Sequence, residues 1–235
     1  MAKIVAMATA GVRSTVAAVL YAEGHEVVLL HVDYGQPVAR AQRTALRAIT
    51  DASGNARLLT VTLPHISEID RYPEGTGEAR SELARQSVGE GAGLSPLALR
   101  GLWPLLWSTG VQCAARIGAE IVCTGMSDAP TGDAAAGPTD RDEPGRGRSF
   151  LHAYNIMLES ALTRGRGVRL EAPLMDVSFA DTVRLASRYK VPLEKTWSCT
   201  DSGKHPCGGC ASCRARMDAF ADARLSDPLV ETLQV

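Results

Sequence analysis

The sequence has no excess of charge of one sign. Lys and Arg together number 25 and Asp and Glu number 26 among 235 residues, so the formal net charge is −1. A protein that binds long duplex nucleic acid presents a concentrated positive surface to the phosphates. The charge balance therefore predicts that nucleic acid is not a partner.

Long apolar runs are also missing. No stretch approaches the roughly 20 residues needed to span a bilayer. The apolar run at residues 4–10 is too short for the core of a secretory signal peptide. Without such a signal, we expect the six cysteines to be free thiols or metal ligands in a reducing compartment. The sequence thus predicts a cytoplasmic protein without a membrane anchor, in which Cys113 and Cys123 are buried small hydrophobes.

Four cysteines stand close together near the C-terminal end of the sequence. They have the spacing C-x7-C-x2-C-x2-C over Cys199, Cys207, Cys210 and Cys213. Two overlapping C-x2-C steps put three thiolates on one tight turn, and a fourth arrives from a short loop, which encloses a tetrahedral ion completely. The spacing predicts a structural zinc site that stabilises the fold. An iron–sulfur cluster is the first alternative, and disulfides are the second.

Apolar segments of strand and helix type alternate along the chain. Residues 3–8 and 25–32 have the pattern of buried strands, and residues 15–23 between them have helical spacing. A strand, turn, helix and strand within about thirty residues are typical of a parallel βαβ unit. The alternation continues with predicted helices at 39–52, 97–117, 152–163 and 179–189 and predicted strands at 57–62, 120–125 and 169–173.

This alternation predicts an α/β protein with a doubly wound parallel sheet. We expect a nucleotide-binding domain over residues 1–195 and a C-terminal module, formed by the four cysteines and a helix, over residues 196–235. The stretches 64–96 and 129–149 are rich in Gly, Pro and charged or small residues and are predicted to be loops.

Ligands of open parallel sheets bind where the strands end. The first strand end, residues 7–15, is a Thr-, Gly- and Ser-containing turn before a helix N-terminus, which suits an anion such as pyrophosphate. Its alternative is that Ser14 or Thr15 only caps the helix. Three further strand ends are candidates: Asp33-Tyr34-Gly35-Gln36, Thr124-Gly125-Met126-Ser127-Asp128 and the segment that ends at Asp176. The first is explained equally well by a plain turn. For the last, the simpler explanation is that Asp176 or Ser178 is the N-cap of the next helix.

Together these segments resemble the 7-cyano-7-deazaguanine synthases, which belong to the N-type ATP pyrophosphatase (PP-loop) superfamily. The resemblance runs nearly end to end. It is carried by Asp33-Tyr34-Gly35-Gln36, Ile117-Gly118-Ala119-Glu120, Ala172-Pro173-Leu174-Met175-Asp176, Thr196-Trp197-Ser198-Cys199 and Cys207-Gly208-Gly209-Cys210-Ala211-Ser212-Cys213-Arg214. It implies an ATP-dependent C–N ligase of queuosine biosynthesis. Such an enzyme converts 7-carboxy-7-deazaguanine and ammonia to 7-cyano-7-deazaguanine through an adenylated carboxylate and an amide, with ATP, Mg²⁺ and a structural Zn²⁺, as a homodimer.

Carried over residue by residue, the resemblance implies an ATP-binding loop at the first strand end. The ATP-binding residues are then Thr9, Ala10, Gly11, Val12, Arg13, Ser14, Thr15 and Gly125. Catalytic roles fall to Arg13, Ser14 and Asp33. The family's loop is Ser-Gly-Gly-x-Asp-Ser, so Arg13 stands here in place of an aspartate. It reverses the local charge, is able to bind phosphate itself, and removes a contributor to magnesium handling.

The substrate side departs from the family as well. Leu99-Arg100-Gly101-Leu102 replaces Pro-Gly-Arg-Asn, and residues 140–144 occupy the region of a base-facing segment. A changed pocket implies a changed substrate, because a site that hydrogen-bonds one base rejects its analogues. Two alternatives therefore stand beside the synthase. One is a divergent homologue that adenylates a related carboxylate for another acceptor, and the other is a catalytically inactive homologue that binds a nucleotide or a partner.

Overall fold

The structure is a computed structural model that describes residues 2–64, 101–129, 147–162, 167–201 and 203–233. It contains one five-stranded sheet in which every neighbouring pair is parallel. The strands are β1 (Ala2–Met7), β2 (His25–Asp33), β3 (Ala56–Thr62), β4 (Ile121–Cys123) and β5 (Arg169–Glu171). Their order is β3-β2-β1-β4-β5, which confirms the predicted doubly wound parallel sheet.

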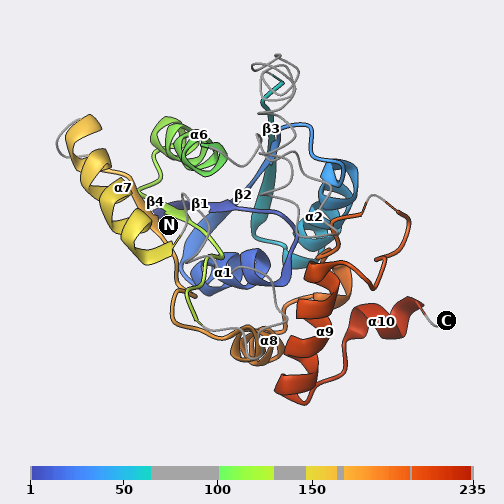
Figure 1. Cartoon of the computed structure of the whole chain (residues 1–235). Helices are drawn as coiled ribbons and strands as arrows, with labels where there is room; N and C mark the ends of the chain where they lie inside the picture. The colour runs from blue at the N-terminus through green and yellow to red at the C-terminus, as the bar shows by residue number, and fades with distance from the viewer. Residues whose placement is uncertain (1, 65–100, 130–146, 163–166, 202, 234–235) are drawn as a thin grey trace, which may run out of the picture.

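Helices cover both faces of the sheet (Figure 1). On one face lie α1 (Val12–Ala22) and α2 (Ala39–Ser53), whose Ala18 and Leu46 pack on Leu29 of β2. On the other face lie α6 (Leu102–Ile117) and α7 (Gly147–Ala161), where Trp107 and Leu158 share a second cluster with Val5 and Leu30. Strands β1, β2 and β4 are largely buried, as their continuous apolar sequences require, whereas the edge strand β3 is partly exposed.

The C-terminal helices form an outer layer against α1. They are α8 (Phe179–Arg188), the short 3-10 helix η1 (Leu193–Lys195), α9 (Ala211–Ala223) and α10 (Pro228–Leu233). Val183 of α8 and Phe220 of α9 share an apolar cluster with Val16 of α1. The segment between η1 and α9, which carries the first cysteines, runs on the side of α2 (Figure 1).

Two predicted helix starts were too late. Helix α1 begins at Val12, so residues 12–14 form its first turn and not a loop. Helix α7 begins at Gly147, inside the stretch that composition assigned to a loop. Of the helix predicted over residues 97–117, the structure describes Leu102–Ile117, and residues 97–100 lie outside the described residues. Polar and small residues in a first helical turn carry no apolar period, so the pattern starts too late. Residues 65–96 and 130–146 of the predicted loops lie outside the described residues.

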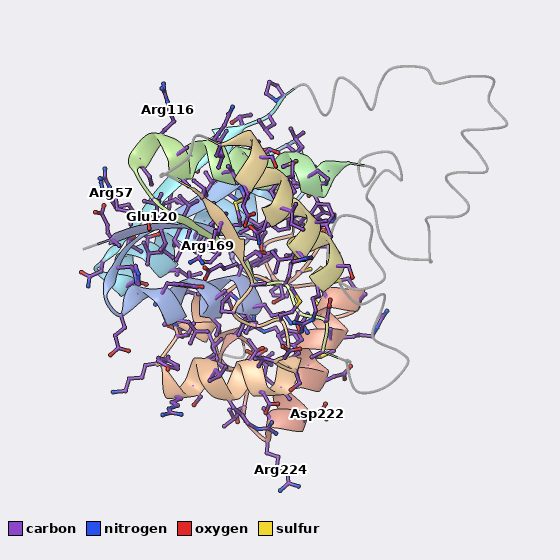
Figure 2. All side chains as sticks on the ribbon, turned by 90° about the vertical axis from the view of Figure 1, so that its left-hand side faces the viewer. Arg57, Arg116, Glu120, Arg169, Asp222 and Arg224 are labelled. Atoms are coloured by element: carbon purple, nitrogen blue, oxygen red, sulfur yellow. The ribbon has the colours of Figure 1, made fainter. Side chains whose placement is uncertain are left out.

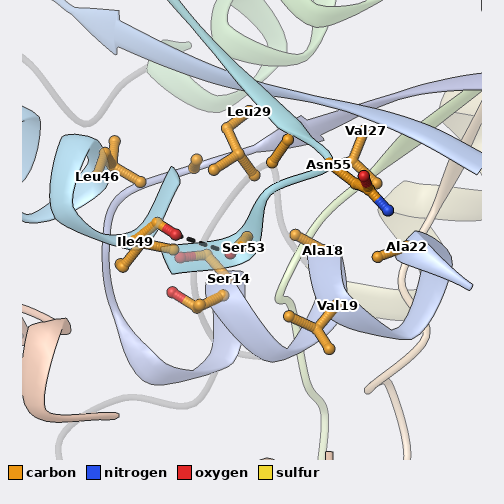
Figure 3. A pocket seen from close by; sticks show the side chains of 13 residues that line it. Ser14, Ala18, Val19, Ala22, Val27, Leu29, Leu46, Ile49, Ser53 and Asn55 are labelled. Carbon is orange, nitrogen blue, oxygen red and sulfur yellow. Dashed lines mark hydrogen bonds between the residues drawn. The ribbon is translucent and has the colours of Figure 1, made fainter. Parts of the chain in front are cut away.

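An apolar cavity of about 30 Å³ lies between α1, α2 and the strands beneath them (Figure 3). The side chains of Ala18, Leu29, Leu46 and Ile49 line it, and the Ser53 hydroxyl on its rim donates to the Ile49 carbonyl at 2.7 Å. Its lining is uncharged, so it does not suit a triphosphate. Small alanines along α1 leave this space in the core.

Arg57, Glu120 and Arg169, which are labelled in Figure 2, stand at the starts of β3, β4 and β5 and mark the amino ends of these strands. Of the two cysteines outside the cluster, Cys123 is fully buried, as predicted, whereas Cys113 is only partly buried against the α6–α7 core. None of the helices that the structure describes combines the length and the apolar character needed to cross a bilayer.

Candidate active site

The strand order places the four predicted strand ends in a row, from β2 through β1 and β4 to β5. After β1 the chain continues into α1 on one face, whereas the next described helix after β4 is α7 on the other face. Connections that diverge to opposite faces open a crevice at the carboxyl edge, and ligands of doubly wound sheets bind there. The structure thus brings the turn at Thr9–Gly11 next to the segment that begins at Thr124.

The hydroxyls of the first turn bond within the loop and do not cap the helix. Gly11 is the N-cap of α1, and no side chain caps it. Ser14 Oγ donates to the Gly11 carbonyl at 3.1 Å and lies 3.2 Å from Thr9 Oγ1, and Thr15 Oγ1 donates to the same carbonyl at 2.8 Å. Gly11 has no side chain with which to cap α1, and the N-terminus of a helix suits an anion.

Ala10 adopts a left-handed conformation in this loop. Its φ is +62°, and its side chain is fully buried. A non-glycine residue with this φ costs about 1 kcal/mol or more, so the surroundings must hold it there. One such restraint is the backbone N–H of Trp197, which donates to the Ala10 carbonyl at 2.8 Å.

Gly125 lies against the first turn of α1. An ideal Cβ built on it would be 2.6 Å from the Ser14 backbone nitrogen and 2.7 Å from the Arg13 carbonyl carbon. Real Cβ atoms do not approach backbone atoms so closely, so only glycine fits here. The predicted ATP-binding residue Gly125 is thus in direct contact with the loop that it was expected to join.

Arg13 extends from the first turn of α1 toward the start of α8. Its guanidinium carbon lies 4.6 Å from the centroid of the Phe179 ring, a cation–π contact. Phe179 is the first residue of α8 and Arg13 stands in the first turn of α1, so the contact joins the starts of two helices, where the dipoles favour an anion. Sequence reasoning missed Phe179, because nothing local links two residues so far apart in the chain.

Asp33 ends β2 and is engaged by its own surroundings. Its carboxylate pairs with Arg43 and accepts the Gly35 N–H at 3.1 Å, and the Tyr34 N–H donates to Gln36 Oε1 at 2.9 Å. A tight turn is therefore present at Tyr34-Gly35. The carboxylate stays at the carboxyl edge, but its position is set by Arg43.

The ends of β4 and β5 are joined by hydrogen bonds. Ser127 Oγ donates to the Val177 carbonyl at 2.9 Å, and the Asp128 N–H donates to the Met175 carbonyl at 2.8 Å. At α8 the N-cap is Ser178, which accepts the Asp181 N–H at 3.0 Å, so that Asp176 is not the cap. Asp176 is exposed, and its carboxylate pairs with Arg148 of α7.

The four cysteines of the C-terminal segment converge. Their sulfur atoms all lie within 4.8 Å of one another, and Cys199 and Cys210 Sγ are 4.0 Å apart. Tetrahedral zinc with Zn–S bonds of about 2.3 Å requires sulfur separations of about 3.8 Å. Backbone N–H groups point at the sulfurs, with Cys207 donating to Cys199 and Cys213 to Cys210 at 3.3 and 3.4 Å. The donor set therefore fits a closed metal site.

Electrostatics prepare one of these thiols for ligation. Burial raises the pKa of Cys199 and of Cys213. Burial acts the same way on Cys210, but hydrogen bonds from the side chain and backbone of Thr200 and from the Cys213 N–H lower its pKa to about 6. Cys210 is therefore a thiolate at neutral pH, the form that binds metal.

Sequence reasoning also missed Arg216, a buried cation on α9. Its side chain is 5% exposed, and its Nε and Nη2 donate to the two oxygens of Asp227 at 2.6 and 2.8 Å. Nη1 donates to Thr196 Oγ1 at 2.7 Å, and Nη2 donates to the Leu193 carbonyl at 3.1 Å. In the sequence it is one arginine among several, and only the packing of η1, α9 and α10 makes it a core residue.

His31 is a second buried polar residue that sequence reasoning did not assign. It is 1% exposed on β2, and its Nδ1 lies 3.2 Å from the Ala8 carbonyl oxygen, just before the loop. A carbonyl only accepts, so Nδ1 carries the proton. Burial lowers the pKa of His31, so the imidazole is neutral at pH 7 and supports the β1 end as a hydrogen-bond donor.

Comparison with known proteins gives a family and a fold. The family model described as queuosine biosynthesis protein QueC matches residues 3–224. A 7-cyano-7-deazaguanine synthase of Methanothrix thermoacetophila is 32% identical over 97% of this chain and 98% of its own length. Another 7-cyano-7-deazaguanine synthase, of Synechococcus sp. strain CC9605, is 31% identical over 95% of this chain and 94% of its own length.

Among solved structures, the U34-tRNA thiolase NcsA of Methanococcus maripaludis, described with its [4Fe-4S] cluster, is similar with a TM-score of 0.50 and 12% identity. That match covers 95% of this chain and 70% of the thiolase. At this identity the similarity shows the fold alone.

Proposed function

The chain belongs to the QueC family of queuosine biosynthesis proteins, and from this premise we propose that it converts 7-carboxy-7-deazaguanine to 7-cyano-7-deazaguanine with ATP and ammonia. The observation that carries the proposal is the position of the N-terminus of α1, which begins after Gly11 where the connections from β1 and β4 diverge. Such a terminus suits the phosphates of ATP. The full-length similarity to named synthases supports the choice of reaction.

The proposed reaction makes a poor electrophile reactive twice. A carboxylate oxygen of the substrate attacks the α-phosphorus of ATP, the α–β anhydride bond breaks, and pyrophosphate leaves. Ammonia then attacks the carbonyl carbon, and the loss of AMP and a proton gives the amide. The amide oxygen attacks a second ATP in the same way, and departure of AMP with a further proton leaves the nitrile. Positioning and charge stabilisation are the main tasks of the protein in such chemistry.

Three groups of this chain serve those tasks in the proposal. The N–H groups at the start of α1 bind the pyrophosphate portion of ATP, and the guanidinium of Arg13 stabilises its negative charge beside them. Ser14 and Thr9 hold the loop through their hydroxyl contacts. Asp33, paired with Arg43, stands at the adjacent strand end, where it orients the nucleoside or substrate side of the crevice.

The proposed enzyme uses two metals, Zn²⁺ at the four cysteines and Mg²⁺ on the phosphates of ATP. Zn²⁺ would be held by the four cysteine sulfurs and would supply structural stability only. Mg²⁺ would reduce the charge on the phosphates, but the loop offers it no carboxylate because Arg13 occupies the family's aspartate position. Mg²⁺ on a nucleotide is commonly bound by phosphate oxygens and water, so the proposed reaction needs no protein ligand for it.

The proposal is tested by incubating the protein with ATP, Mg²⁺, ammonium and 7-carboxy-7-deazaguanine and following products by mass spectrometry. We expect the amide and then the nitrile. ATP binding without either product would favour the divergent ligase with another carboxylate or acceptor. Absence of ATP binding in calorimetry would favour the inactive homologue.

Arg13→Asp tests the role of the residue that departs from the family. In the proposal Arg13 stabilises the phosphates in place of the family's aspartate, and the variant loses this cation beside Phe179. We then expect kcat/KM for ATP to fall by about tenfold or more, the effect of losing one charged contact. Steady-state pyrophosphate release measures this, with Arg116→Asp on α6 as the control of equal charge change. A variant more active than the parent would mean that Arg13 impairs the loop.

Gly125→Ala tests the close contact between β4 and α1. Its methyl group must displace the backbone of Arg13 or Ser14, and a shift of this kind at a reacting site costs about 100-fold in rate. We expect this loss in kcat/KM for ATP. Gly167→Ala is the matched control, because its Cβ would meet no atom within 4 Å. Full activity of Gly125→Ala would show that the loop does not need this contact.

Two further properties belong to the proposal. We place the protein in the cytoplasm, because the four clustered cysteines suit a reducing compartment. We also expect a homodimer, as in the family resemblance, and the exposed apolar side chains of Ile156 and Met157 on α7 support a partner at that helix. The molar mass from light scattering checks the second point.

A further inference from the structure

We infer that the four-cysteine module fixes the conformation of the ATP loop through the backbone N–H of Trp197, so that metal binding and ATP binding are coupled. The inference rests on the proposed function for the identity of the ligand. The contact between module and loop, however, is a property of the fold and is measurable without ATP. It gives Trp197 the role of a positioning residue.

The backbone of Trp197 is hydrogen-bonded to the loop before α1. The Trp197 N–H donates to the Ala10 carbonyl at 2.8 Å, and Ala10 is the loop residue held at φ +62°. The carbonyl of Ala10 and the N–H of Gly11 belong to one planar trans peptide and point in opposite directions. Holding the carbonyl therefore sets the direction of the Gly11 N–H, which lies at the N-cap of α1.

The residues on either side of Trp197 are held by hydrogen bonds. On one side, the hydroxyl of Thr196, which is 1% exposed, accepts a hydrogen bond from Arg216 of α9 at 2.7 Å. On the other side, buried Cys199 is one of the four clustered sulfurs and accepts the N–H groups of Asp201 and Cys207, both at 3.3 Å. The segment around Trp197 is thus fixed at both ends by the module.

The side chain of Trp197 packs in the same apolar cluster as Ala8 and Ala10, beside α1. The backbone N–H of Trp197 thus bonds to the loop, while its side chain packs against the apolar cluster to which the loop residue Ala10 belongs. Loss of the metal frees Cys199 from the other three sulfurs and loosens this segment, and the left-handed Ala10 then loses the hydrogen bond that offsets its strain.

A pair of substitutions separates the N–H from the indole. Trp197→Pro removes both, whereas Trp197→Ala removes only the indole. Proline is compatible with the preceding residue, because Thr196 has φ −78° and ψ 150°, the extended region that a residue before proline prefers. The comparison of the two variants therefore reports the hydrogen bond to Ala10.

The experiment measures amide hydrogen exchange of the loop at residues 8–15 in the metal-loaded full chain without ATP, with β2 as the internal reference. Metal content and ATP affinity, the latter by calorimetry, are recorded on the same samples. Relative to Trp197→Ala, we expect Trp197→Pro to retain its metal, to exchange about tenfold faster in the loop, and to bind ATP about tenfold more weakly, which corresponds to one hydrogen bond. Metal removal from the parent protein should accelerate the same loop while β2 stays protected.

Equal loop exchange in the two variants would overturn the inference, as would an unchanged loop after metal removal. Faster loop exchange with unchanged ATP affinity would also overturn it. A parent protein that binds no ATP would contradict the proposed function instead. In that case the exchange comparison still decides whether the module holds the loop.

Discussion

Replacing Cys210 with serine is expected to release the metal and to melt the segment between η1 and α9, while the five-stranded sheet stays folded. Cys210 Sγ lies 4.0 Å from Cys199 Sγ and accepts the Cys213 N–H, so it occupies a corner of the closed site. Structural zinc contributes an apparent free energy of about 10 kcal/mol or more, and a site with three thiolates retains only part of it. This is the largest effect that we predict for one substitution.

Serine separates the metal from the helix cap. Cys210 is the N-cap of α9, and serine is among the best N-cap residues, so the start of the helix keeps its hydrogen bond. Metal content by mass spectrometry and a thermal unfolding scan measure the outcome. Cys113→Ser on α6 is the matched control, because this thiol lies outside the cluster. A variant with a full equivalent of metal and an unchanged Tm would refute the closed four-thiolate site.

Asp227→Ala is expected to lower the free energy of unfolding by about 3–5 kcal/mol, the usual cost of leaving one member of a buried ion pair without its partner. The side chains of Arg216 and Asp227 are 5% and 8% exposed, so water does not screen the remaining charge. Asp227 also accepts the Leu229 N–H at 3.0 Å near the start of α10, and this bond is lost as well. The expected site of the damage is the joint between η1, α9 and α10.

Chemical denaturation with a melting scan measures this loss. Asp218→Ala is the matched control, since Asp218 lies exposed on α9 and its removal should change stability by no more than about 0.5 kcal/mol. Replacing both partners by apolar residues, Arg216→Met with Asp227→Leu, should recover much of the stability because no buried charge remains. A loss below about 1 kcal/mol for Asp227→Ala would mean that the pair is solvated in solution.

The sheet class and the cysteine cluster could be predicted from the sequence alone. Strands such as His25–Asp33 are recognisable in the sequence as largely apolar runs. The four cysteines from Cys199 to Cys213 are close in sequence, so their sulfurs can meet with little contribution from the rest of the fold. Both are local signals, because a buried strand and a metal-binding turn each depend on residues that are close together in the sequence. The parallel order then placed the predicted strand ends on one edge.

Which distant residues meet at that edge depends on the three-dimensional packing and could not be predicted from the sequence. The contacts of Trp197 with Ala10, of Phe179 with Arg13 and of Gly125 with the first turn of α1 each join segments that lie far apart in the chain. The same holds for the buried pair of Arg216 and Asp227, which looks like two ordinary surface charges in the sequence. Such contacts depend on the strand order and on how helices pack over the sheet, and packing between distant segments leaves no periodic pattern in a single sequence.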